Sequence, residues 1–286
     1  LNPTYPERQP MSVKKPKISV LIPVHNGADT LAETVASILN QTFADFELLL
    51  FDDASTDASP EIINSFADSR IRRFRSDANL GISETRNRLM ELAAGEYLAV
   101  MDHDDLSAPR RLEKQAAWLD NNPEVAMVGS WGRLFCTRPP FPGIFGRIKQ
   151  AFVNLGWVWC QPEHPDIHDA LCGNPVMHSS AMLRRSALVR DNITYNPDYS
   201  PAEDYDLCRQ LLAAGWQLAN LPEVLFCYHY HGRNYSLTHK KAMRRADRKV
   251  KNDILRLLGR KRSFCPYFLV MLQKLRLKKF PRNCND

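Results

Sequence analysis

The amino-acid sequence predicts an α/β fold in which a mainly parallel, Rossmann-like sheet is flanked by helices. Short apolar runs rich in β-branched residues alternate four times with segments of helical periodicity over the first 121 residues. The connections between these segments are short, which is typical of consecutive βαβ units. Several predicted strands end on polar or acidic residues, and open α/β sheets bind their ligands at that edge.

Each predicted element has its own sequence signal. Strands are predicted over residues 18–22, 46–51, 71–74 and 96–101, of which the first stops at a proline and the second and fourth stop at acidic residues. Helices are predicted where apolar residues recur every three or four positions, over residues 28–40, 60–66, 83–93 and 109–121. Pro60 and Pro109 suit a first helical turn, and Gly95 ends the third helix.

The second half of the chain is less regular. Residues 133–170 lose periodicity and contain several prolines and glycines, which predicts a loop or flap that holds Trp157 and Trp159. These rings either pack the loop onto the domain or stack on a sugar or a base. Further elements are predicted as a helix over 201–214, a strand over 224–230, a basic amphipathic helix over 238–258 and an apolar, basic stretch over 264–277.

A cluster of three carboxylates, Asp102, Asp104 and Asp105, follows the strand over 96–101. Carboxylates this close repel one another, and a hard divalent cation such as Mg²⁺ or Mn²⁺ relieves the repulsion through oxygen ligands. The alternative is a solvated acidic loop in which Asp105 caps the next helix. His25-Asn26 and Asp52-Asp53 also follow strands, so the sheet edge is expected to gather all three groups in one crevice.

Composition bounds the class of protein. The chain has 286 residues, of which 44% are hydrophobic and 24% charged, as in an ordinary folded protein of one or two domains. Its 7 cysteines form no CxxC pair, so neither a zinc site nor a disulfide framework is indicated. No apolar run approaches the roughly 20 residues of a membrane span. Residues 1–17 lack the apolar centre of a signal peptide. We therefore expect a cytoplasmic protein.

The charge is unevenly distributed. Residues 238–286 hold sixteen Lys or Arg against three Asp, whereas the rest of the chain is mildly acidic. A basic amphipathic tail suits the anionic inner face of the cell membrane, on which the protein is expected to be peripheral. The alternative is that the apolar stripe of the tail packs on the catalytic domain. Nucleic acid is not an expected partner, because no recognition motif accompanies the charge.

Six short motifs occur in an order and spacing that resemble the inverting family 2 glycosyltransferases, which have the GT-A fold. The resemblance covers residues 17–235. The motifs are residues 19–26 (SVLIPVHN), 38–43 (ILNQTF), 52–57 (DDASTD), 79–87 (NLG with TRN), 102–105 (DHDD) and 203–207 (EDYDL).

This resemblance implies a donor site for a UDP-sugar. Pro23, His25 and Asn26 would line the uracil pocket, with the His25 ring stacked on the base. Asp53 would accept the uracil N3–H, a proton that cytosine lacks. Arg86 would face the pyrophosphate; alternatively, it forms a surface salt bridge.

The resemblance also implies a DxD metal site. Asp104 would bind Mn²⁺ or Mg²⁺ directly, and Asp102 would hold the ribose or a metal-bound water. The metal would bridge the two phosphates and neutralise the leaving diphosphate.

Inversion requires a base on the face of the sugar opposite the leaving group. Asp204 matches the base of the family, and we expect its place at a helix N-terminus to keep it ionised. Glu203 is expected to contact the acceptor or to support Asp204, and His178 to lie on the acceptor side. The alternative is that Glu203 and Asp204 are only N-terminal helix charges.

The resemblance divides the chain into a glycosyltransferase domain over 17–235 and a tail over 236–286. Within the domain, residues 17–105 would bind the nucleotide and residues 106–235 the acceptor. No QxxRW motif follows the EDYDL segment, which favours addition of one sugar to a glycan acceptor, possibly lipid-linked, in bacterial surface-polysaccharide or lipooligosaccharide synthesis.

Two rival functions remain at this stage. A nucleotidyltransferase is disfavoured because residues 23–27 offer one glycine and no lysine in place of a Gly-rich basic loop. A non-catalytic nucleotide-binding protein with a lipid- or nucleic-acid-binding tail is the other rival. The joint presence of Asp53, Asp104 and Asp204 argues against it.

Overall fold

The computed structural model describes residues 15–137, 142–231, 234–259 and 277–279. The strands are β1 (Ile18–Val24), β2 (Phe46–Asp52), β3 (Ile71–Arg75), β4 (Tyr97–Val100), β5 (Leu106–Ser107), β6 (Val125–Phe135), β7 (Trp157–Trp159), β8 (Met182–Arg184), β9 (Gln217–His229) and β10 (Leu277–Lys279). The α-helices are α1 (Leu31–Leu39), α2 (Ser59–Ser65), α3 (Ile82–Leu92), α4 (Arg111–Asn121), α5 (Ile144–Val153), α6 (Ile167–Cys172), α7 (Arg185–Asp191), α8 (Glu203–Ala213), α9 (Tyr235–Thr238) and α10 (Lys240–Leu257). Two short 3₁₀ turns, His178–Ser180 and Pro197–Tyr199, complete the described elements.

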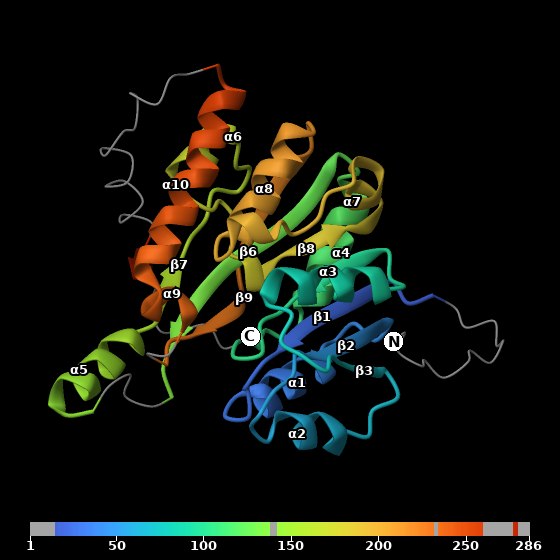
Figure 1. The fold of residues 1–286 in the computed structure, drawn as a ribbon, viewed down its shortest axis with the longest axis vertical. Coiled ribbons are helices and arrows are strands. Elements are labelled where there is room, and N and C mark those ends of the chain that lie inside the picture. The colour runs from blue at the N-terminus through green and yellow to red at the C-terminus, as the bar shows by residue number, and fades with distance from the viewer. Residues whose placement is uncertain (1–14, 138–141, 232–233, 260–276, 280–286) are drawn as a thin grey trace.

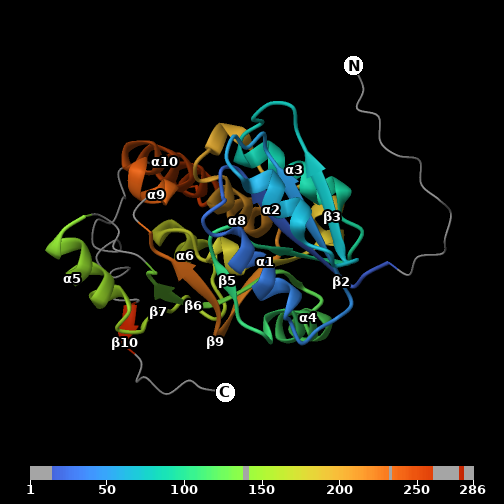
Figure 2. The ribbon, with the colours of Figure 1, turned by 90° about the horizontal axis from the view of Figure 1, so that it is seen from below.

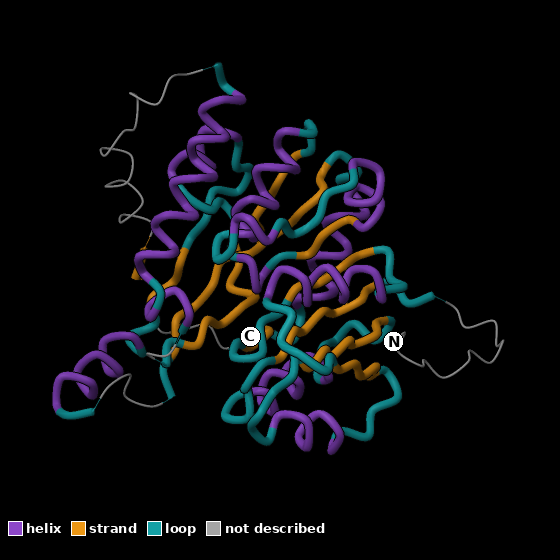
Figure 3. The backbone as a smooth tube through the Cα atoms, viewed as in Figure 1, coloured by secondary structure: helices purple, strands orange, loops and turns teal. Residues whose placement is uncertain are grey.

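One sheet runs through the molecule in the order β10-β7-β6-β8-β4-β1-β2-β3 (Figures 1 and 3). Strands β1 to β4 are parallel, as predicted, and β1 lies between β2 and β4. The second half departs from a parallel sheet, because β8 runs antiparallel between β4 and β6, and β7 pairs antiparallel with β6. Strand β9 returns parallel to β6 and also pairs with β5. The result is a mixed α/β fold whose regular half is the one that the sequence predicts.

The sheet has one hydrophobic core on each face because side chains alternate along a buried strand. Ile18, Val20 and Ile22 of β1 pack in one cluster with apolar residues of α1, α2 and α4. Leu21, between them, belongs to a second cluster with α3, α7 and α8. In Figure 1, α1 and α2 lie on one side of β1 to β3 and α3 lies on the other. Both layers of helices therefore hold the carboxyl ends of β1, β2 and β4 at one edge.

Over the described part of 133–170 the prediction of a loop or flap is wrong, and residues 138–141 lie outside the described residues. In that range the structure places the end of β6, then α5, β7 and α6. The prediction relied on the prolines and glycines around these short elements and overlooked the regular apolar spacing within α5. Trp157 and Trp159 lie on β7, and Trp157 packs against Phe152 of α5 with ring centroids 5.2 Å apart.

The basic helix predicted over 238–258 is present as α10, but its apolar face is buried. Val250 and Ile254 are inaccessible to solvent and pack with Ala170 of α6 and Tyr205 of α8. Asp253 of α10 also accepts a hydrogen bond from the Tyr199 hydroxyl at 2.7 Å. The expected membrane contact therefore does not use this stripe. The apolar, basic stretch predicted over 264–277 lies outside the described residues except at Leu277. Within the described ranges, no helix has the length and apolar character to cross a bilayer.

Candidate active site

The loop after β4 carries the acidic motif, and two elements hold its backbone. The Thr34 hydroxyl of α1 lies 2.9 Å from the carbonyl oxygen of His103 and 2.8 Å from that of Asp105, to which it donates. The loop after β1 approaches so closely that a Cβ on Gly27 would lie 2.4 Å from Cδ2 of His103. The acidic loop is therefore fixed against the β1–α1 segment, as the sheet topology requires.

Asp105 is buried and does not cap α4, which corrects the alternative reading of this residue. Its Oδ1 accepts a hydrogen bond from the backbone N–H of His229 at 2.9 Å and so ties the loop to the end of β9. Burial, together with the charges of Asp104 and Asp102, raises the pKa of the Asp105 carboxyl well above its usual range. Asp105 thus has a structural role distinct from that of the other two carboxylates.

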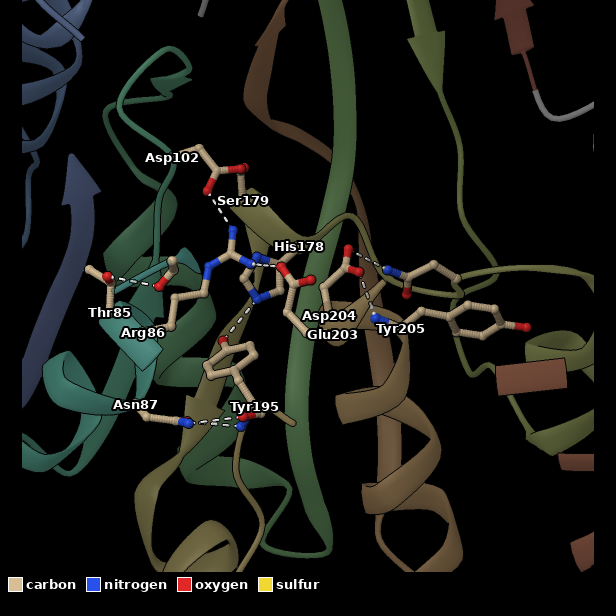
Figure 4. A network of polar contacts seen from close by, with 12 residues as sticks. Thr85, Arg86, Asn87, Asp102, His178, Ser179, Tyr195, Glu203, Asp204 and Tyr205 are labelled. Carbon is tan, nitrogen blue, oxygen red and sulfur yellow. Dashed lines mark hydrogen bonds and ion pairs between the residues drawn. The ribbon is translucent and has the colours of Figure 1, made fainter. Parts of the chain in front are cut away.

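Arg86 of α3 lies at the centre of the site, between two carboxylates (Figure 4). It is buried, and it donates from Nη2 to Oδ1 of Asp102 at 2.8 Å and from Nη1 to Oε1 of Glu203 at 2.7 Å. This arrangement excludes the surface salt bridge considered from the sequence. Arg86 joins the loop after β4 to the first turn of α8, segments that are more than a hundred residues apart in the chain.

Asp102 is held ionised by its neighbours. Burial opposes the charge, but the Arg86 guanidinium and the Ser179 hydroxyl lower the pKa of the Asp102 carboxyl to about 2. The Ser179 hydroxyl donates to Oδ2 of Asp102 at 2.5 Å, opposite the oxygen that faces Arg86. The orientation of Asp102 is therefore set from both sides.

Asp204 is half-buried at the start of α8, beside Glu203 (Figure 4). Its Oδ2 accepts from the Asn174 side-chain amide at 2.9 Å, and its Oδ1 accepts from the backbone N–H of Tyr205 at 2.7 Å. Burial and the adjacent Glu203 charge raise the pKa of the Asp204 carboxyl to about 7. The expectation that the helix N-terminus keeps Asp204 ionised is therefore wrong, because burial and like charge outweigh the helix dipole.

Glu203 and His178 are less accessible than the sequence suggested. Glu203 is 4% exposed, its Oε1 accepts from Arg86, and its Oε2 has no hydrogen-bond partner among the described residues. The His178 Nε2 lies 2.8 Å from the Tyr195 hydroxyl, and the two rings meet edge to face. Burial and the Arg86 charge lower the pKa of His178 well below its usual range, so the ring is neutral.

The predicted base pocket lies at the ends of β1 and β2. Pro23 is buried in β1, whereas His25 and Asn26 are exposed after it. The His25 Nδ1 is 2.7 Å from the carbonyl oxygen of Asp53. The Asp53 side chain accepts hydrogen bonds from the loop after β3, from the backbone N–H of Leu80 at 2.8 Å and of Gly81 at 3.0 Å and from the Ser76 hydroxyl at 3.0 Å.

The Asp104 carboxylate contacts His231, whose Nε2 lies 3.0 Å from its Oδ2. The two side chains are partly exposed and lie in the segments that follow β4 and β9. Within the described ranges, no three His, Cys, Asp or Glu side chains form a ready-made cage for a metal. A Mg²⁺-type site needs no such cage, because one or two protein ligands and substrate phosphates suffice. The donor set of Asp104 and His231 fits a site of this kind.

Sequence reasoning missed the residues that orient the predicted ones. Ser179 holds Asp102, and Tyr195 contacts His178. The Asn87 amide in turn pairs with the backbone of Tyr195 (Figure 4). Asn174 lies outside the six motifs, and its side-chain amide donates to Asp204. Side chains such as Ser179 carry no periodic or compositional signal, so only the fold reveals them.

Comparison with known proteins identifies the class of enzyme. Residues 19–188 match the family model described as glycosyl transferase family 2. The match covers more than half of the chain, so the protein belongs to glycosyl transferase family 2. It is therefore an enzyme that transfers sugar groups.

Several relatives and solved structures are similar over most of the chain. The putative glycosyltransferase EpsE of Bacillus subtilis is 33% identical over 216 residues, which are 74% of this chain and 72% of that protein. The UDP-Glc:alpha-D-GlcNAc-diphosphoundecaprenol beta-1,3-glucosyltransferase WfaP of Escherichia coli is 26% identical over 254 residues, 88% of this chain and 91% of that protein.

The fold is that of solved GT-A enzymes. A structure of Staphylococcus aureus TarS in complex with UDP-GlcNAc matches with a TM-score of 0.61 at 16% identity, over 91% of this chain and 72% of that one. The mannosyltransferase PcManGT of Pyrobaculum calidifontis, in complex with GDP-Man and Mn²⁺, matches with a TM-score of 0.60 at 19% identity, over 92% and 74% of the chains. At these identities the likeness establishes the fold alone.

Proposed function

We propose that this glycosyltransferase transfers one sugar from a UDP-sugar to a glycan acceptor, with inversion at the anomeric carbon. The observation that carries the proposal is the network in which Arg86 joins Asp102, from the acidic motif, to Glu203, the neighbour of Asp204. This network holds the Asp204 carboxyl group, whose pKa is about 7, near the acidic motif that is suited to a nucleotide diphosphate. A base with a pKa near the working pH is the effective kind.

Asp204 acts as the base in this proposal. Its carboxylate takes the proton of the acceptor hydroxyl while that oxygen bonds to the anomeric carbon. The bond from this carbon to the phosphate oxygen breaks on the opposite face, and UDP leaves. Asn174 and the backbone of Tyr205 hold the carboxylate oxygens through the hydrogen bonds described above. Glu203 fits the role of a positioning residue for Arg86 better than that of an acceptor contact, because it is buried against the guanidinium.

His25, Asn26, Pro23 and Asp53 form the proposed uracil pocket. The exposed His25 ring offers a stacking surface, and its Nδ1 is fixed by the contact with the carbonyl of Asp53. The Asp53 carboxylate makes three hydrogen bonds of the roughly four that its oxygens accept, so one accepting position remains for uracil N3–H. The support from other proteins is that TarS has been solved with UDP-GlcNAc, and the name of WfaP includes UDP-Glc.

Asp104 is the proposed ligand of Mn²⁺ or Mg²⁺, with His231 as its partner and Asp102 close by in the same loop. When bound, such a cation supplies Lewis-acid stabilisation of the leaving diphosphate. Arg86 holds Asp102 ionised and oriented for its contact with the ribose or with a metal-bound water. Support from a neighbour is the Mn²⁺ in the PcManGT complex.

The acceptor is proposed to be a growing surface glycan on a lipid carrier, as in lipooligosaccharide and related polysaccharides. The name of WfaP includes a diphosphoundecaprenol-linked sugar, and that of ExoO includes succinoglycan biosynthesis. The acceptor-side role of His178 stays a proposal; its Nε2 lies 2.8 Å from the Tyr195 hydroxyl.

The test is UDP release from a panel of UDP-sugars, with Mn²⁺ or Mg²⁺ and with an EDTA control. Metal-dependent release from one donor supports the proposal and names the sugar. If UDP binds without release, the lipid-linked acceptor is added, and transfer should then appear and be lost in Asp204→Asn. The absence of both release and UDP binding would refute the donor site.

A further inference from the structure

Helix α5 carries an apolar face that the rest of the described chain leaves exposed. Ile144, Phe145, Ile148 and Phe152 are 64%, 74%, 57% and 49% exposed. Ile144, Ile148 and Phe152 recur every four residues, so they form one stripe along the helix, and Phe145 adjoins it. An apolar stripe of four large side chains in water is unfavourable unless another surface covers it.

The opposite side of α5 is fixed to the domain. Val153 is buried, and Gln150 donates to the carbonyl oxygens of Cys136 and Thr137 at 3.2 and 2.9 Å. Asn154, just after the helix, exchanges hydrogen bonds with the backbone of Cys136. The end of β6 thus holds α5 by its polar side, and the apolar stripe is directed away from the core.

The charges around the stripe are positive. Arg147 is exposed, and Lys149 lies on the other edge of the stripe, with Nζ 5.6 Å from the centre of the Phe152 ring. No acidic residue occurs in the sequence from 125 to 162. Figures 1 and 2 both place α5 at the same end of the molecule as α9 and the start of α10. There, Lys240, Lys241, Arg244 and Arg245 are exposed.

We propose that the exposed face of α5 docks on the surface of an anionic phospholipid bilayer. Its four apolar side chains enter the boundary between headgroups and acyl chains, and Arg147 and Lys149 contact the phosphates. Interfacial helices combine an apolar stripe with flanking Lys or Arg in this way. The basic residues at the start of α10 add long-range attraction to the anionic surface. Membrane contact is thus assigned to α5, since the apolar stripe of α10 is buried.

Membrane contact would bring the enzyme to the proposed lipid-linked acceptor and so rests on the proposed function, but binding to a bilayer can be measured without catalysis. The assay is co-sedimentation of the full chain with vesicles in the absence of donor. Vesicles of phosphatidylglycerol and phosphatidylcholine are compared with vesicles of phosphatidylcholine alone. The variants are Phe145→Asp and Ile148→Asp. The matched control is Val189→Asp on α7, which is 72% exposed and lies at the other end of the molecule in Figure 1.

The expected result is that the wild type and Val189→Asp bind anionic vesicles, and each α5 variant binds them at least about tenfold more weakly, a change of about 1.4 kcal/mol. Circular dichroism and light scattering check the fold and the oligomeric state of every variant. Equal binding by all proteins, or none by the wild type, overturns the proposal. Loss of a wild-type dimer in the α5 variants would overturn it in favour of a second copy of the chain. If the protein binds vesicles but releases no UDP from any donor, even with the acceptor added, the proposed function is refuted and the proposed membrane contact is not.

Discussion

The substitution Asp204→Asn separates the chemistry of the proposed base from the stability of the fold. The amide keeps one oxygen that accepts from Asn174, but its NH2 group then faces the backbone N–H of Tyr205, so one of the two hydrogen bonds is lost at every pH. It removes the group that takes the proton, and transfer should fall to background while UDP binding stays intact. The same change also removes a carboxylate whose ionisation is opposed by burial and by Glu203.

The size of the stability effect follows from the pKa. Folding raises the pKa of Asp204 from 3.8 to about 7. The folded state therefore binds more protons than the unfolded state between these values, and stability from this group falls as the pH rises from about 4 to 7. A difference of about three pH units is worth at most about 4 kcal/mol. Because the side chain is only half-buried, solvent screening reduces this to about 1–2 kcal/mol.

The assay is thermal unfolding of both proteins in EDTA without UDP, at pH 4.5 and at pH 8. The melting temperature of the variant minus that of the wild type should be lowest at pH 4.5, where Asp204 is neutral in the folded wild type and its ionisation in the unfolded chain costs only a small part of the full effect. At pH 8 this difference should be roughly 2–4 °C higher than at pH 4.5, from the usual relation between free energy and melting temperature in domains somewhat smaller than this chain. A difference that is the same at both pH values, or lower at pH 8, would show that Asp204 is not held against ionisation.

Three further substitutions, with one control, test the metal site, the ion pairs of Arg86 and the packing of α10. Asp104→Ala should abolish the Mn²⁺-dependent part of UDP binding in calorimetric titrations. A wild-type affinity for UDP that is the same with and without Mn²⁺ would contradict the metal site. Arg86→Ala leaves two carboxylates without their cation, so the free energy of unfolding measured in urea should fall by about 3–5 kcal/mol. A fall below about 1 kcal/mol would mean that water solvates these carboxylates and that the ion pairs add little to stability. Val250→Asp places a charge where α10 packs and should cost about 3 kcal/mol or more. Leu257→Asp, at an exposed position of the same helix, should stay within about 0.5 kcal/mol.

The regular half of the fold was predictable because its signals are local. The apolar runs at 18–22 and 46–51 became β1 and β2 with their ends shifted by one or two residues, and the helices between them follow from apolar spacing. In the second half, α8, α10 and the end of β9 were predicted, but β6, β7 and β8 were not, because these strands pair across long stretches of chain. Strand β8 is three residues long, and its place between β4 and β6 is fixed by tertiary pairing that no local pattern expresses.

The same distinction holds at the site. Asp102, Asp104 and Asp204 were predicted because they lie in short motifs, whereas Ser179 was missed because it contacts Asp102 from a segment 77 residues away. The electrostatics of Asp204 were misjudged for a related reason. The sequence shows the helix N-terminus, which favours the charge, but it does not show burial or the proximity of Glu203 and Arg86, which decide the pKa.

The ion pairs of Arg86 explain why the assignment of the base depends on the three-dimensional structure. The family match ends at residue 188, so it includes Arg86 and Asp102 but neither Glu203 nor Asp204. Arg86 extends from the matched region to the unmatched one, where it bonds to Glu203 at 2.7 Å. A buried guanidinium with two carboxylate partners is costly to rearrange, since losing either partner exposes an uncompensated charge. The first turn of α8, which includes Asp204, is therefore tied to the acidic loop after β4, and this contact supports the proposed role of Asp204 independently of the match.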